Sequence, residues 1–84
     1  MELYMQIRKA NMNYIINWVL KQYLKYEQLD SDTIVVITEK CNFKVTRERD
    51  GYLVEKGTRW IEGYTIIRVA RERQAVVWME GFLK

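Results

Sequence analysis

The chain has 84 residues, a formal net charge of +3, one cysteine, and no histidine or proline. A chain of this length forms one domain, residues 1–84, and buries only a small core. Because histidine is absent and Cys41 stands alone, we expect no structural zinc site, no serine or cysteine triad and no internal disulfide.

The N-terminal region shows no basic segment followed by an apolar run and a small-residue cleavage site, so no secretory signal is predicted. Its most apolar stretch, residues 14–20, is far shorter than the roughly 20 residues that span a membrane. A lone cysteine suits a reducing compartment, where Cys41 would be a small buried apolar residue. We therefore expect a cytoplasmic protein that does not bind membranes.

Residues 2–8 fit two kinds of structure. Alternating apolar residues such as Leu3, Met5 and Ile7 favour a short strand. The spacing of Leu3, Ile7 and Ala10 fits a helix as well, and both alternatives stay open.

A helix is predicted over about residues 11–28, with Asn11 or Asn13 as its N-cap. Its polar strip is narrow and its apolar stripe is broad, which indicates contacts on more than one side. The apolar positions are Tyr14, Ile15, Ile16, Trp18, Val19, Leu20, Tyr23, Leu24 and Tyr26.

Antiparallel strands are predicted over about residues 33–84, after a loop at residues 30–32. The expected strands cover residues 33–38, 43–49, 52–55, 64–70 and 74–79, with a further strand beginning at Trp60. Asp50-Gly51 predicts a two-residue type I′ hairpin turn. Arg71-Glu72-Arg73 predicts a second hairpin, between the last two strands.

These elements predict an α+β fold, in which the N-terminal helix packs on a four- to five-stranded antiparallel meander sheet. The alternative is that the strands curl into a small barrel capped by the helix. Both faces of the strands are rich in apolar residues, and one helix cannot cover both. Part of the apolar surface must then meet a barrel interior, a second subunit or a partner.

Arginine and aromatic residues on the strands and the helix are the candidates for a protein interface, because these types dominate binding hot spots. Arg68 interrupts an otherwise apolar strand, so it is either wet on an outer surface or anchored at an interface. The interface candidates are Trp18, Tyr64, Ile66, Arg68 and Trp78.

Basic and aromatic residues of the strands suggest nucleic acid as an alternative partner, since arginine binds phosphate and aromatic rings stack on bases. The candidates for this contact are Lys44, Arg47, Arg49, Trp60, Arg71 and Arg73. Acidic residues alternate with several of them, which is also how proteins keep strand edges soluble.

The predicted function is a small non-enzymatic binding module that acts through protein–protein contacts and forms a homo-oligomer, with a dimer favoured. A regulator or inhibitor of a larger host machine, of the kind that phages and mobile elements encode, fits this size and chemistry. The alternatives are a nucleic-acid-binding domain and a sequestering pocket for a small anionic ligand. No cofactor or metal is expected.

Overall fold

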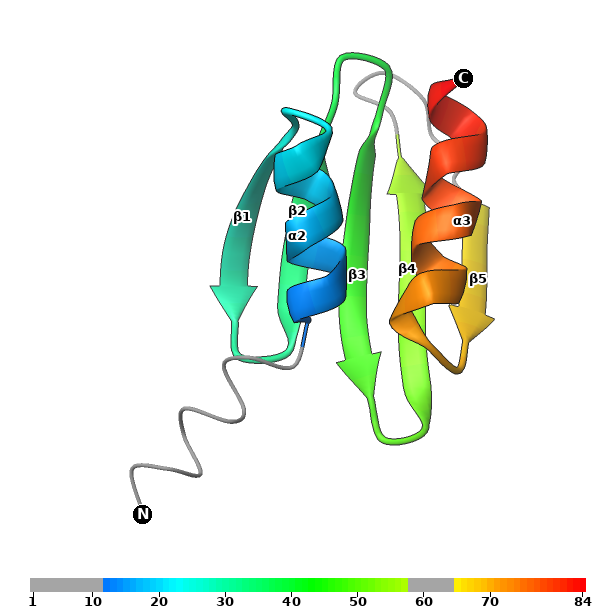
Figure 1. Cartoon of the computed structure of the whole chain (residues 1–84). Coiled ribbons are helices and arrows are strands. Elements are labelled where there is room, and N and C mark those ends of the chain that lie inside the picture. Colours follow the sequence, from blue (N-terminus) through cyan, green and yellow to red (C-terminus); the bar gives the residue numbers. More distant parts are fainter. Residues whose placement is uncertain (1–11, 58–64) are drawn as a thin grey trace.

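The computed structural model describes residues 12–57 and 65–84, and the predictions for residues 2–8 and for a strand beginning at Trp60 lie outside these ranges. Its elements are α2 (Asn13–Lys21), β1 (Lys25–Asp30), β2 (Thr33–Ile37), β3 (Asn42–Glu48), β4 (Gly51–Gly57), β5 (Thr65–Val69) and α3 (Glu72–Leu83). The strands form one antiparallel sheet in the order β1-β2-β3-β4-β5. In the described part, α2 lies over the β1 side of the sheet and α3 over β4 and β5 (Figure 1).

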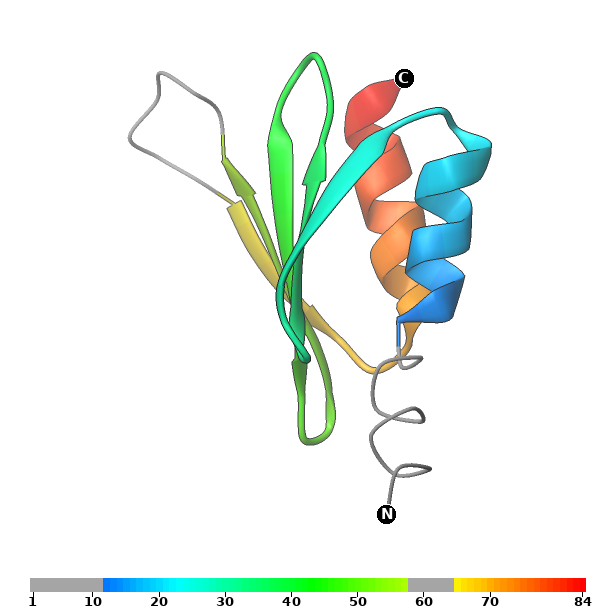
Figure 2. The ribbon, with the colours of Figure 1, turned by 90° about the vertical axis from the view of Figure 1, so that its left-hand side faces the viewer.

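The predicted α+β fold, a helix on an antiparallel meander, is confirmed. The sheet is open rather than closed into a barrel, because β1 and β5 stand at its two ends and do not pair with each other. Both described helices lie on the same side of the sheet (Figure 2).

The first described helix is shorter than predicted and ends at Lys21. Tyr23 takes a left-handed backbone conformation with φ 59°, and the Leu24 N–H donates to the Val19 carbonyl at 3.0 Å. This pattern is the Schellman motif that ends many helices. The residues that follow, predicted to continue the helix to position 28, form β1 instead.

The predicted strand over residues 74–79 and the hairpin at residues 71–73 are both wrong, because this segment forms the helix α3. Gln74 starts it by accepting bonds at 3.0 Å from the N–H groups of Ala70 and Arg71 with its side-chain oxygen. Ala75, Val76 and Met79 are buried at helical spacing. A short apolar run fits either period, and here the helical period is the correct one.

The hairpin predicted at Asp50-Gly51 exists, but its two turn residues are Arg49 and Asp50, because Glu48 pairs with Gly51. Neither turn residue has the positive φ of a type I′ turn. Gly51 is required for another reason. A Cβ built on it would lie 2.2 Å from the carbonyl oxygen of Val69 in β5.

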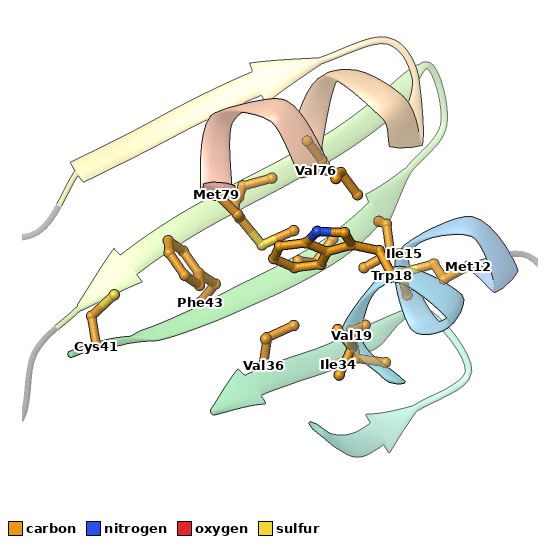
Figure 3. Close-up of a cluster of buried hydrophobic side chains, with 13 residues drawn as sticks. Met12, Ile15, Trp18, Val19, Ile34, Val36, Cys41, Phe43, Val76 and Met79 are labelled. Carbon is orange, nitrogen blue, oxygen red and sulfur yellow. The ribbon is translucent and has the colours of Figure 1, made fainter. Parts of the chain in front are cut away.

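The core lies between the sheet and the two described helices, with Phe43 of β3 fully buried near its centre (Figure 3). Met79 of α3 and Val19 of α2 reach it from the helix layer. Ala75, Val76 and Met79 therefore belong to this core and not to a second apolar sheet face. Cys41 is buried and free, as predicted.

Candidate functional site

One side of the sheet faces α2 and α3, and no described element covers the other side, which we call the open face (Figure 2). Side chains alternate along a strand, so the buried Ile34 and Val36 place Val35 and Ile37 on the open face. The strand register extends this assignment across the sheet. The side chains of the open face include Lys25, Glu27, Val35, Ile37, Asn42, Lys44, Thr46, Glu48, Leu53, Glu55, Ile66 and Arg68.

A continuous cross-strand row runs through the middle of the open face. Glu27, Val35, Lys44, Glu55 and Ile66 are successive partners from β1 to β5. Opposite charges therefore face each other at Lys44 and Glu55, and aliphatic side chains stand on either side of this pair. Directly opposed residues of opposite charge stabilise a sheet.

Arg68 is exposed on the open face, and this position fits both alternatives predicted for it, a wet outer surface and an anchor for a partner. Its Nε donates to Oε1 of Glu48 at 3.1 Å, and the pair spans from β5 to β3 across Gly51 and Leu53 of β4. The pair is largely exposed, so its contribution to stability is small. It does set the direction of the Arg68 side chain.

Aliphatic side chains are distributed among these charges. Ile66 is 50% exposed and Ile37 is 37% exposed, while Val35 and Leu53 are half-buried. The open face thus presents an apolar component interrupted by charges that balance each other. A non-obligate protein interface has about the same apolar share as the rest of a protein surface, and the open face is compatible with one.

The other interface candidates do not lie on the open face. Trp18 of α2 is only 8% exposed, and its indole Nε1 donates to Oε2 of Glu80 in α3 at 3.1 Å. Trp78 is half-buried, with its ring edge-on to Phe82 at 4.8 Å between centroids. Tyr64 is outside the described residues. Ile66 and Arg68 are therefore the members of this set that share a surface.

The structure scatters the candidates for nucleic-acid contact. Lys44 is exposed on the open face, opposite Glu55. Arg47 alternates to the helix side of β3, where its Nε donates to Oδ1 of Asp32 at 3.0 Å. Arg49 is exposed in the turn after β3. No continuous basic strip results from these positions in the described part of the chain.

Arg71 and Arg73 are exposed at the start of α3, on the helix layer rather than on the open face. Trp60, the aromatic member of the nucleic-acid set, lies outside the described ranges. The predicted combination of arginine with an aromatic platform is therefore not brought together by the residues that the structure places.

A shallow depression at the end of the sheet is the candidate for the predicted pocket for an anionic ligand. It is lined by residues that include Lys25, Glu39 and Lys40. Lys40 is already engaged, because its Nζ donates to the carbonyl oxygens of Leu83 and Lys84 at 3.2 and 3.3 Å. The lining also contains one further base, Lys25, and one acid, Glu39, so it has no surplus of positive charge to hold an anion.

Within residues 12–57 and 65–84, no group of three or more acidic or cysteine side chains is placed to hold a metal ion. None of the described helices has the length and apolar character needed to cross a membrane.

Sequence reasoning missed Leu53 and Glu55, two central residues of the open face. The sequence predicted the hairpin between β3 and β4 but not its register, and it is the register that places Glu55 opposite Lys44 and Leu53 opposite Thr46. No family model, curated protein or solved structure matches this chain. The open face is therefore the candidate functional site.

Proposed function

We propose that this protein is a small non-enzymatic binding module that takes a protein partner on the open face. The observation behind this proposal is the one-sided architecture. In the described part, both helices cover one side of the sheet, while the other side presents Ile66, Ile37 and Leu53 without cover. A rigid sheet that displays aliphatic side chains at fixed spacing is suited to a partner of matching shape.

The charge of the open face favours a protein over a nucleic acid. Lys25, Lys44 and Arg68 are matched there by Glu27, Glu48 and Glu55. Binding to a phosphate backbone depends on a surplus of basic groups, which this face does not offer. A protein partner can carry charges complementary to both the basic and the acidic residues, and it can cover the aliphatic side chains at the same time.

A role as a regulator or inhibitor in the cytoplasm goes with this proposal. The buried, free Cys41 is in keeping with a reducing compartment. Such modules act by occupying a surface of a larger assembly, and their action requires no catalytic group.

The test compares affinity purification of the wild-type chain, a Leu53→Lys variant and a Val77→Lys variant from extracts of the source cells. Val77 is 62% exposed on α3, so its substitution adds the same charge on the helix layer as a matched control. We expect a protein that binds the wild type and the Val77→Lys variant and is lost with Leu53→Lys at moderate salt. Circular dichroism verifies that both variants are folded.

Two results would contradict the proposal. One is a set of bound proteins that Leu53→Lys leaves unchanged. The other is nucleic acid that co-purifies and is released between low and moderate salt, which would favour the alternative partner.

A further inference from the structure

The two edges of the sheet differ in how well they are protected against pairing with another strand. β1 has a register shift between Gln28 and Asp30 and bears the charged residues Lys25, Glu27 and Asp30. Bulges and charges of this kind are the means by which proteins prevent pairing at an edge. The β1 edge is therefore protected.

β5 lacks these features. Its register with β4 is continuous from Tyr52 opposite Val69 to Lys56 opposite Thr65. Its sequence is Thr-Ile-Ile-Arg-Val, in which four of the five residues are β-branched. No described residue pairs with its outer edge. β-branched residues favour strand pairing, so this edge is suited to accept another strand.

Arg68 is the one charged residue of β5, and its side chain does not prevent another strand from pairing with the outer edge of β5. Glu48 of β3 binds its guanidinium at 3.1 Å, which draws the side chain inward over β4 and away from the outer side. Gly51, the partner of Glu48 on β4, has no side chain in the path of this contact. The charge is neutralised within the sheet.

We infer that two copies of the chain pair antiparallel through β5, with Ile67 at the two-fold axis. This register places Thr65 opposite Val69 of the second copy and Ile66 opposite Arg68 of the second copy. It is self-complementary, as a two-fold interface must be. Ile66 then packs on the aliphatic part of the partner arginine, whose charged end is held by its own Glu48.

This pairing has a consequence for the proposed function. A two-fold axis perpendicular to the sheet keeps both helix layers on one side and joins the two open faces into one continuous surface on the other. The inference deepens the proposed function because it doubles the binding surface, but it rests on the β5 edge and holds whether or not the open face binds a protein.

The test is the solution mass by light scattering of the wild type, Ile66→Lys and Leu53→Lys, at low and moderate salt. We expect twice the chain mass of 10.2 kDa for the wild type and for Leu53→Lys at both salt concentrations. Ile66→Lys replaces the aliphatic contact with Arg68 of the second copy by an ammonium group that the pairing would desolvate, so we expect it to be a monomer. A monomeric wild type, or a dimer that persists in Ile66→Lys, would overturn the inference.

The register is tested by oxidation of cysteine variants in a Cys41→Ala background with oxidised glutathione. Residues directly opposite in a sheet have Cβ atoms about 4.5–5.5 Å apart, within the range of a disulfide, whereas diagonal neighbours are about 7–8 Å apart between Cα atoms. Ile67→Cys should therefore cross-link the two copies, and the more exposed Ile66→Cys should not. The reverse order would overturn this register.

The Leu53→Lys variant distinguishes failure of the proposed function, a protein partner on the open face, from failure of the pairing of two copies through β5. If Leu53→Lys loses the protein partner and stays dimeric, both stand. If it stays dimeric and keeps its partner, the proposed function fails alone, and if the wild type is monomeric and Leu53→Lys loses its partner, the β5 pairing fails alone.

Discussion

Oε1 of Glu72, in the first turn of α3, accepts a hydrogen bond at 3.1 Å from the backbone N–H of Ile15, in the first turn of α2. The residue at the N-cap of α2 is Met12, which offers no side-chain bond to the free N–H groups there. A carboxylate from the other helix takes the place of a local cap, and its negative charge suits the positive end of the helix dipole. This contact links two helices that are far apart in sequence.

Replacement of Glu72 by alanine should lower the free energy of unfolding by about 1–2 kcal/mol, because the cap of α2 and the side-chain hydrogen bond between Glu72 and Tyr52 are both lost. Urea denaturation followed by tryptophan fluorescence measures the change. Glu39→Ala is the matched control, since Glu39 is an exposed residue in the connection after β2 and forms no ion pair among the described residues. Equal stability of both variants would show that Glu72 does not act as a cap.

We expect the free energy of unfolding to fall at alkaline pH because of Tyr52. Burial raises the pKa of Tyr52 above its ordinary value of 10.0, and the neighbouring Glu72 carboxylate raises it further, while Arg47 acts in the opposite direction. Below about pH 10 the folded and unfolded chains both keep this proton. As pH rises from there through the folded pKa, the unfolded chain loses the proton first, so the fold loses stability.

The measurement is the free energy of unfolding as a function of pH for the wild type and for Tyr52→Phe. The difference between the two isolates Tyr52 from other groups that titrate in this range. Relative to the variant, the wild type should be constant near neutral pH and should lose stability above about pH 10. A difference that is independent of pH up to alkaline denaturation would contradict the role given to Tyr52.

The strands between residues 33 and 57 could be predicted from the sequence because β-branched runs and turn residues agree there. The segment after residue 70 could not, because Ala75, Val76 and Met79 satisfy a helical period that a six-residue window does not distinguish from a strand. The role of Gln74 as a local acceptor is likewise visible only once the backbone of Ala70 and Arg71 is in place.

Which side chains are neighbours on the open face depends on the register between β3 and β4, and this register depends on the position of the turn that joins the two strands. A turn at Asp50-Gly51 would place Lys44 opposite Gly57, whereas the turn at Arg49-Asp50 places it opposite Glu55. Such a shift of two residues keeps every side chain on its face but changes its neighbours. Ile66 and Arg68 were therefore found from the sequence, and the row that links them to Lys44 was not.

Tyr23 occupies a backbone conformation that ordinarily belongs to glycine. It has φ 59° at the end of α2, and its side chain is 95% exposed. The left-handed conformation costs a residue with a Cβ about 1–2 kcal/mol. Tyr23→Gly removes this strain but adds freedom to the unfolded chain, so we expect a net gain of about 0.5 kcal/mol in unfolding free energy.

Tyr23→Ala is the control for this prediction, because alanine keeps the strained backbone and removes only the exposed ring. Thermal unfolding should place Tyr23→Ala close to the wild type and Tyr23→Gly above both. A melting temperature of Tyr23→Gly below that of Tyr23→Ala would show that the strain assigned to this position is absent.

Gly51 and Gly57, the two glycines of β4, differ in the space available for a side chain. A Cβ on Gly51 would lie 2.2 Å from the backbone oxygen of Val69, whereas a Cβ on Gly57 would meet no atom within 4 Å. Gly51→Ala must displace β5 or the turn before β4, so it should lower the free energy of unfolding by more than about 1 kcal/mol. Gly57→Ala reduces the freedom of the unfolded chain without a clash and should be neutral or stabilising by up to about 1 kcal/mol.

The same pair tests whether β5 is held at its place in the sheet by Gly51. Amide hydrogen exchange should show faster exchange in β5 and in the adjoining half of β4 for Gly51→Ala, and unchanged protection in β1 and β2. Because the displaced strand is also the proposed edge of the dimer, the solution mass of Gly51→Ala should fall toward that of the monomer, while Gly57→Ala stays dimeric. Unchanged exchange in β5 would mean that the close approach of Val69 does not fix this strand.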